Sequence, residues 1–168
     1  MNLNITEKNM KKRIYAFILL ISIVATLTGC GDSKNELDNY RKSVEDFYDE
    51  VIAVNDRINA IDAEGENAPE ELLSELDTLN GLFQDFAELE VPKEYIAVES
   101  LADEAASFMD ESVTLYHSAY NDGTFNSFSA GMAYDKYSRA IIRINYIGDV
   151  LQGKEIEGEG VNVYYGEE

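Results

Sequence analysis

Apolar side chains recur at alternating intervals of three and four residues through the segment 36–61. This spacing returns to one side of an α-helix at every turn, because the helix repeats about every 3.6 residues. Successive inward positions follow the period without a break: Leu37, Tyr40, Val44, Phe47, Val51, Val54, Ile58 and Ile61. The pattern predicts a long amphipathic first helix.

Three further segments carry the same helical period. A second helix is predicted to start directly before Pro69 and to end at Pro92, a third covers 98–119, and a fourth runs from about residue 126 to 152. Their inward positions are expected to be Leu72, Leu76, Leu79, Phe83 and Phe86; then Val98, Leu101, Ala105, Phe108, Ser112, Leu115 and Ala119; and then Phe128, Met132, Tyr137, Ala140, Ile144, Ile147 and Leu151.

Connections of only a few residues join these helices, and short connections favour antiparallel neighbours. We therefore expect an all-α fold, an up-down-up-down four-helix bundle over residues 36–153, preceded by a polar tether over 30–35. The remaining residues, 154–168, are rich in Gly and Glu and have no helical period, which predicts a flexible acidic tail.

The balance of charges is strongly acidic. The 168 residues include 33 Asp or Glu and 13 Lys or Arg, a formal net charge of −20 at pH 7. Binding to nucleic acid phosphates or to anionic lipid through charge needs clustered cations, so both partner classes are excluded. The cations of the fourth helical segment are expected to neutralise acidic neighbours within the bundle: Lys136, Arg139, Arg143 and Lys154.

Candidate chemistry is sparse. One Cys and one His are too few for a disulfide framework, a thiolate zinc site or a two-histidine metal motif. A Ser-His-Asp triad would have to use His117, whose neighbours Ser112, Thr114 and Ser118 offer no strand-turn-helix context for a nucleophile. Thr114 also stands where a di-iron bundle carries the Glu of its Glu-x-x-His ligand motif. We expect no enzymatic activity, no catalytic residue, no metal and no cofactor.

The N-terminus has the three regions of a secretory signal. Four Lys or Arg between residues 8 and 13 precede an uncharged run of 14 residues over 14–27, which is followed by small residues. A helix that spans a bilayer needs about 20 apolar residues, so a signal peptide over 1–29 is favoured over a permanent membrane span.

The signal ends in Leu27-Thr28-Gly29-Cys30, which resembles the lipobox of bacterial lipoproteins. This resemblance implies that the Cys30 sulfur carries a diacylglyceryl group and that a lipoprotein signal peptidase cuts after Gly29. Acyl chains such as palmitate would then anchor the chain in the cell membrane on its extracytoplasmic side. The alternative is an ordinary signal peptide in which Cys30 falls at this place by coincidence. Loss of four cations and one acid with the signal would leave a mature charge of −23.

With Cys30 at the membrane, the predicted topology places the first and third connections at the membrane-distal end. The candidate partner-binding residues there are Tyr116, Tyr120, Phe125, Tyr134, Glu64 and Glu66. Aromatic rings and carboxylates together suit a cationic protein, peptide or small molecule. Alternatively, the rings are core and boundary residues of a bundle that lacks Trp.

A calcium site is a further hypothesis, because hard cations take several oxygen ligands. The carboxylates concerned are Glu64, Glu66, Glu70, Glu71 and Glu75. Their spacing does not match an EF-hand loop, so a solvated charged face is favoured.

The mature chain resembles small helical lipoproteins of bacteria. The sequence thus predicts a membrane-anchored lipoprotein of the bacterial cell envelope, a non-enzymatic helical interaction module or accessory subunit that presents an acidic surface. The alternative is a lipoprotein that binds a small ligand or a cation in a pocket between the helices. A two-lobed solute receptor is disfavoured because the 139 residues that follow residue 29 make one domain. The partner and the oligomeric state stay open.

Overall fold

The computed structural model describes residues 31–121 and 125–154. Within them it contains four α-helices and one short 3₁₀ turn: α2 (Gly31–Ala60), α3 (Ala68–Ala87), η1 (Lys93–Tyr95), α4 (Ile96–Ala119) and α5 (Ser127–Leu151). The predicted all-α four-helix bundle is confirmed. The predicted signal peptide, Cys30 and the tail over 155–168 lie outside the described residues.

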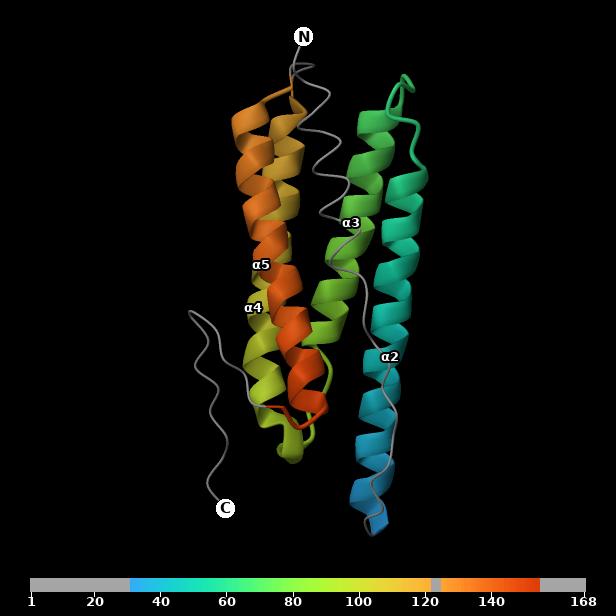
Figure 1. Ribbon diagram of the computed structural model, residues 1–168, viewed down its shortest axis with the longest axis vertical. Coiled ribbons are helices and arrows are strands. Elements are labelled where there is room, and N and C mark those ends of the chain that lie inside the picture. The colour runs from blue at the N-terminus through green and yellow to red at the C-terminus, as the bar shows by residue number, and fades with distance from the viewer. Residues whose placement is uncertain (1–30, 122–124, 155–168) are drawn as a thin grey trace.

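The helices run alternately up and down (Figure 1). The start of α2, the α3–α4 connection and the end of α5 lie at one end of the bundle, and the α2–α3 and α4–α5 connections lie at the other. Each helix packs against the next along the chain, and the backbones of α4 and α5 approach most closely. We call the end with the α2–α3 and α4–α5 connections the distal end.

The helix boundaries follow local sequence signals, with two differences. α2 begins at Gly31, inside the segment 30–35 that was expected to be a tether. α3 starts at the predicted place, with Pro69 in its first turn, but ends at Ala87 rather than at Pro92. Pro92 instead lies in the connection ahead of η1, because residues 88–92 leave the helix before the proline is reached.

α5 has clear signals at both ends. The side chain of Asn126 accepts hydrogen bonds from the backbone N–H groups of Phe128 and Ser129, both at 3.1 Å, which satisfies two donors of the first turn. Gly153 follows the helix with a φ of 71°, the left-handed conformation that glycine adopts without a Cβ penalty.

The apolar stripe predicted for the first helix is confirmed. Tyr40, Val44, Phe47 and Val54 are buried, and the other four positions are half-buried. The core continues through the remaining helices, with these fully or nearly fully buried residues: Leu76, Leu79, Phe83, Phe86, Val98, Leu101, Ala105, Met109, Val113, Ala140, Ile144 and Ile147.

The prediction that Phe128 and Met132 are inward positions is wrong. Their side chains are 75% and 42% exposed, whereas Ala133 is fully buried. At about 100° per residue, Ala133 continues the buried side of α5 through Ala140, and Phe128 and Met132 fall on the opposite flank. In α4, the half-buried Phe108 likewise leaves the central position to Met109, which is fully buried.

Candidate interaction surfaces

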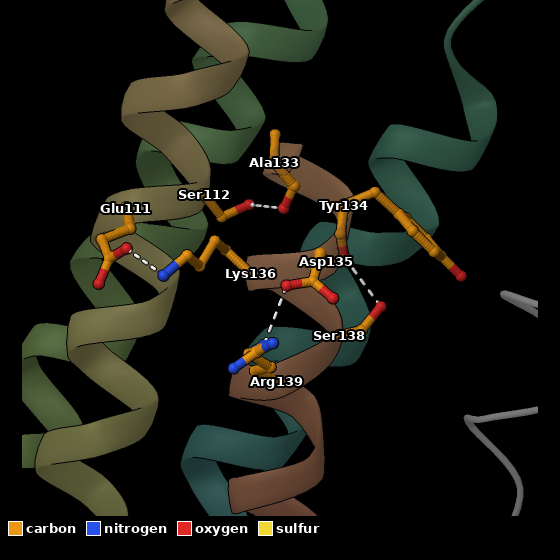
Figure 2. Close-up of polar contacts among 8 residues, drawn as sticks. All are labelled: Glu111, Ser112, Ala133, Tyr134, Asp135, Lys136, Ser138 and Arg139. Atoms are coloured by element: carbon orange, nitrogen blue, oxygen red, sulfur yellow. Dashed lines mark hydrogen bonds and ion pairs between the residues drawn. The ribbon is translucent and has the colours of Figure 1, made fainter. Parts of the chain in front are cut away.

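Four tyrosines lie towards the distal end: Tyr116 in α4, Tyr120 at its C-cap, and Tyr134 and Tyr137 in α5. Tyr116 interacts electrostatically with the other three, so the structure brings the candidates Tyr116, Tyr120 and Tyr134 together. Burial raises the pKa of Tyr116 to about 12, because the phenolate would lose its hydration. Tyr116 and Tyr137 pack against the core, as boundary residues do. Tyr120 and Tyr134 are half-buried, and Figure 2 shows the Tyr134 side chain pointing away from α4.

Exposed apolar side chains surround the start of α5. Phe125 is 56% exposed, and its ring lies 5.1 Å from that of Tyr120. Phe128 and Met132, four residues apart on α5, are also exposed. Of these three, Phe125 was a candidate partner-binding residue, whereas the sequence pattern placed Phe128 and Met132 at inward positions.

The acidic half of the predicted site lies in the other distal connection. Glu64 and Glu66 are exposed in the turn between α2 and α3, where the backbone N–H of Glu64 donates to Asp62 Oδ1 at 3.1 Å. Over the described ranges, no hydrogen bond or ring contact joins either glutamate to the tyrosines. The candidate residues therefore form two surfaces at the same end of the bundle, rather than one site.

Three of the five carboxylates considered for calcium, Glu70, Glu71 and Glu75, line an open groove between α2 and α3. Its lining consists of Arg57, Ala60, Ile61, Asn67, Glu70, Glu71, Ser74 and Glu75. Arg57 Nε donates to both carboxylate oxygens of Glu75, at 3.0 and 2.9 Å, so both oxygens of this carboxylate already accept a hydrogen bond. In the part of the chain that the structure describes, no group of three His, Cys, Asp or Glu is arranged to hold a metal ion.

His117 lies on the surface at the seam between α3 and α4. Its Nε2 atom is 2.7 Å from Asp77 Oδ1, and both side chains are about half exposed. The contact connects the last turn of α4 to α3, and Asp77 is the polar partner of the imidazole.

The cations of α5 are bound to acids, as the sequence predicted. Lys136 pairs with Glu111 of α4, and Arg143 Nε lies 2.7 Å from Glu104 Oε2 of the same helix. Arg139 pairs instead with Asp135 of its own helix, at 2.9 Å (Figure 2).

All three α5 cations also lie near the ring of Phe108. The charged groups of Lys136, Arg139 and Arg143 are 5.4, 5.9 and 5.3 Å from its centroid. The electron-rich ring face favours this arrangement and helps to hold the cations against α4. The side of the α4–α5 hairpin that carries Phe108 is therefore electrically balanced.

The acids of α2 are arranged differently. Asp38, Glu45, Asp49 and Asp56 are all exposed, and their spacing of 7, 4 and 7 residues places them along one side of the helix. Within the described residues none of the four forms an ion pair, although the exposed Lys42 of the same row pairs with Asp46 and also attracts Glu45. We call this set the acidic column. The spacing is visible in the sequence, but a sum of charges does not reveal it.

None of the described helices is long and apolar enough to cross a membrane. A family model described as "Domain of unknown function (DUF7018)" matches residues 32–140, which include α2, α3, α4 and the first half of α5. No curated protein and no solved structure matches this chain.

Proposed function

The chain belongs to the DUF7018 family, and we propose that it is a lipid-anchored, non-enzymatic protein of the bacterial cell envelope that presents an acidic helical surface to a cationic partner. The anchor is supported by Leu27-Thr28-Gly29-Cys30 at the end of the signal. A position of the anchor directly beside the folded domain is supported by α2, whose first residue, Gly31, directly follows Cys30. The lipid and the folded domain would thus be joined without a long linker.

The separation of charge within the bundle carries the proposal. The cations of α5 are held by acids of α4 and α5, whereas the acidic column of α2 has no ion-pair partner among the described residues. Unpaired carboxylates on one side of a rigid helix attract a partner with a matching row of Lys or Arg, and they speed its encounter with the bundle.

The mechanism is display at a membrane. Two or three acyl chains give stable anchoring where one gives only marginal binding. Confinement to the membrane raises the local concentration of the acidic surface for any partner held in the same membrane. The mechanism includes no catalytic step and no cofactor, in keeping with the single imidazole being in contact with Asp77.

The anchor is tested by Cys30→Ala in cells fed radiolabelled fatty acid, with Ser33→Ala as the matched control. The Cys30 variant should incorporate no label and should leave the membrane fraction, while the control should behave like the wild type. Full membrane retention of the Cys30 variant would refute the anchor.

The acidic surface is tested by in-cell crosslinking from a photoreactive residue at Ile52, an exposed position on the same helix as the acidic column. The combined variant Glu45→Gln, Asp49→Asn and Asp56→Asn should lose the crosslinked product. A control that removes three exposed acids elsewhere should keep it: Glu94→Gln, Glu99→Gln and Asp103→Asn. Equal loss in both variants would show that only the total charge matters, against the proposal.

The open groove between α2 and α3 favours a second candidate, the binding of a small organic cation. Glu70 and Glu71 line it without an ion pair in the described residues, next to the pair of Arg57 with Glu75. A ligand that binds the folded state raises the melting temperature. Spermidine should then raise it in the wild type and not in the variant Glu70→Gln, Glu71→Gln. A melting temperature that spermidine leaves unchanged would remove this candidate.

A further inference from the structure

The outer side of the α4–α5 hairpin differs from the rest of the surface. On α4, the exposed or half-buried residues recur at intervals of 4, 3, 4, 3 and 4: Ser100, Glu104, Ser107, Glu111, Thr114 and Ser118. On α5, the same kind of spacing connects Phe128, Met132, Asp135, Arg139, Ile142 and Tyr146. We call these two rows together the neutral face. The ion pairs of Lys136 and Arg143 with α4 lie between the two rows.

The charges of the neutral face cancel. Its acids are Glu104, Glu111 and Asp135, and each is bound to one of the three cations Lys136, Arg139 and Arg143. Four of the six positions in the α4 row are small hydroxyl residues, and four of the six in the α5 row are apolar or aromatic. Small side chains allow a second helix to approach closely, and a heptad row of apolar side chains is the pattern of a helix–helix seam.

We propose that the neutral face binds a second copy of this chain and forms a two-fold symmetric dimer. Charge selects this occupant. A chain with a formal charge of −20 repels its own copies, so self-association is confined to the face where the charges cancel. In an isologous contact each copy supplies the same surface, and the paired charges and apolar rows of one copy meet those of the other.

The size of the face comes close to what a stable dimer buries. Helices of 24 and 25 residues are about 36 Å long at about 1.5 Å per residue, so two adjacent helices offer on the order of 600 Å². Stable interfaces bury roughly 800 Å² per partner, and connection residues such as Phe125 extend the face. Phe128, at 75% exposed, is the most exposed large apolar side chain that the contact would cover.

The orientation of the dimer rests on the proposed lipid anchor, although the contact itself does not. The face runs along the bundle, so a two-fold axis parallel to the helices keeps both α2 starts at the same end. Both anchors then reach one membrane, and the two acidic columns remain outside the contact.

Sedimentation equilibrium of the detergent-solubilised full chain tests the contact. The wild type should form a dimer, and the double variant Phe128→Glu, Met132→Glu should associate roughly 100-fold more weakly, because it places like charges across the axis. The control Ile52→Glu, Ala53→Glu adds the same charges at two exposed apolar positions of α2 and should dimerise like the wild type. Circular dichroism checks that all three chains are equally helical.

A second measurement locates the contact in membranes. Met132→Cys should give a disulfide-linked dimer on mild oxidation, because a disulfide needs Cα atoms about 4.4–6.8 Å apart. Asp49→Cys, in the acidic column, and the wild type should give no disulfide-linked dimer under the same treatment.

The proposal is overturned by a wild type that stays monomeric, or by a dimer that the Phe128→Glu, Met132→Glu variant forms equally well. Phosphatidylglycerol vesicles that bind a monomeric wild type, but not this variant, would also overturn it and assign the face to lipid. The Cys30→Ala chain separates the two proposals: a dimer that no longer fractionates with membranes upholds both. Retention of that chain in the membrane contradicts the anchor and leaves the dimer test intact.

Discussion

The two hairpins of the bundle are packed with different side chains. Between α4 and α5 the buried positions include Ala105, Ala133 and Ala140, and the hydroxyl of Ser112 donates to the Ala133 carbonyl at 2.8 Å. Between α2 and α3 aromatic rings fill the seam. The centroids of Phe47 and Phe86 lie 4.2 Å apart.

The size of the buried side chains explains how closely the helices approach. Alanine and serine let the backbones of α4 and α5 come near each other, whereas phenylalanine rings hold α2 and α3 further apart. The α4–α5 hairpin, which we call the close hairpin, pairs Lys136 and Arg143 with acids across its seam. The α2–α3 hairpin, which we call the aromatic hairpin, pairs only Arg57 with Glu75 across its seam in the described residues, and the acidic column of α2 forms no ion pair there. One heptad pattern therefore supports two kinds of packing and two kinds of surface.

Removing an aromatic ring from α3 should have the largest effect. Phe83 is 1% exposed and its ring lies 5.4 Å from that of Phe47, so Phe83→Ala leaves a cavity and should cost about 3–5 kcal/mol in the free energy of unfolding. The control Phe128→Ala, at an exposed position of the monomer, should change it by less than about 0.5 kcal/mol at protein concentrations too low for the proposed dimer. Urea unfolding measures both, and similar losses would contradict the assignment of the two rings.

Enlarging a side chain should damage the close hairpin instead. Ala133 is fully buried against α4, so Ala133→Leu should cost about 1–3 kcal/mol by overpacking. Ala53→Leu, on the exposed side of α2, is the control and should be close to neutral. If urea unfolding shows no loss of stability for Ala133→Leu, the seam between α4 and α5 can hold a larger side chain. Small side chains would then not explain the close approach of these two helices.

Alkaline pH should weaken the distal part of the close hairpin. The pKa of Tyr116 is raised from 10.0 in the unfolded reference to about 12, so the folded state favours the neutral phenol. Its contribution to stability is fully present below pH 10 and is lost as the pH rises through about 12. Melting temperatures between pH 9 and 12 should fall less steeply for Tyr116→Phe than for the wild type. Parallel curves would argue against a buried Tyr116.

Removing the hydrogen bond that joins the two hairpins should have the smallest effect on the free energy of unfolding. The Tyr48 hydroxyl of α2 donates to the Ile144 carbonyl of α5 at 2.7 Å, and Gly148 leaves room for it, since a Cβ there would lie 3.3 Å from the hydroxyl. Tyr48→Phe should cost about 0.5–1.5 kcal/mol. Tyr146→Phe, which removes a hydroxyl without a hydrogen bond in the described residues, should cost less in the same urea experiment. The reverse order would show that Tyr48 does not join the hairpins.

The sequence predicted where the helices lie better than it predicted which side of each helix is buried. The apolar period placed Tyr40 and Val44 in the core, and Pro69 marked the start of α3. The same reasoning failed for Phe128 and Met132, because hydrophobicity says that a side chain favours burial and not whether a neighbouring helix covers it. The candidate site was likewise resolved only in part: the tyrosines come together, but Glu64 lies on a separate surface.

The sequence by itself determined the helical class, the order of the helices and the excess of acid, because each depends on residue types and their spacing along one chain. The tertiary structure decided which charges cancel and which rings stay exposed. Those properties depend on contacts such as Arg143 with Glu104, between residues far apart in sequence, and helical period carries no information about which helix lies next to which.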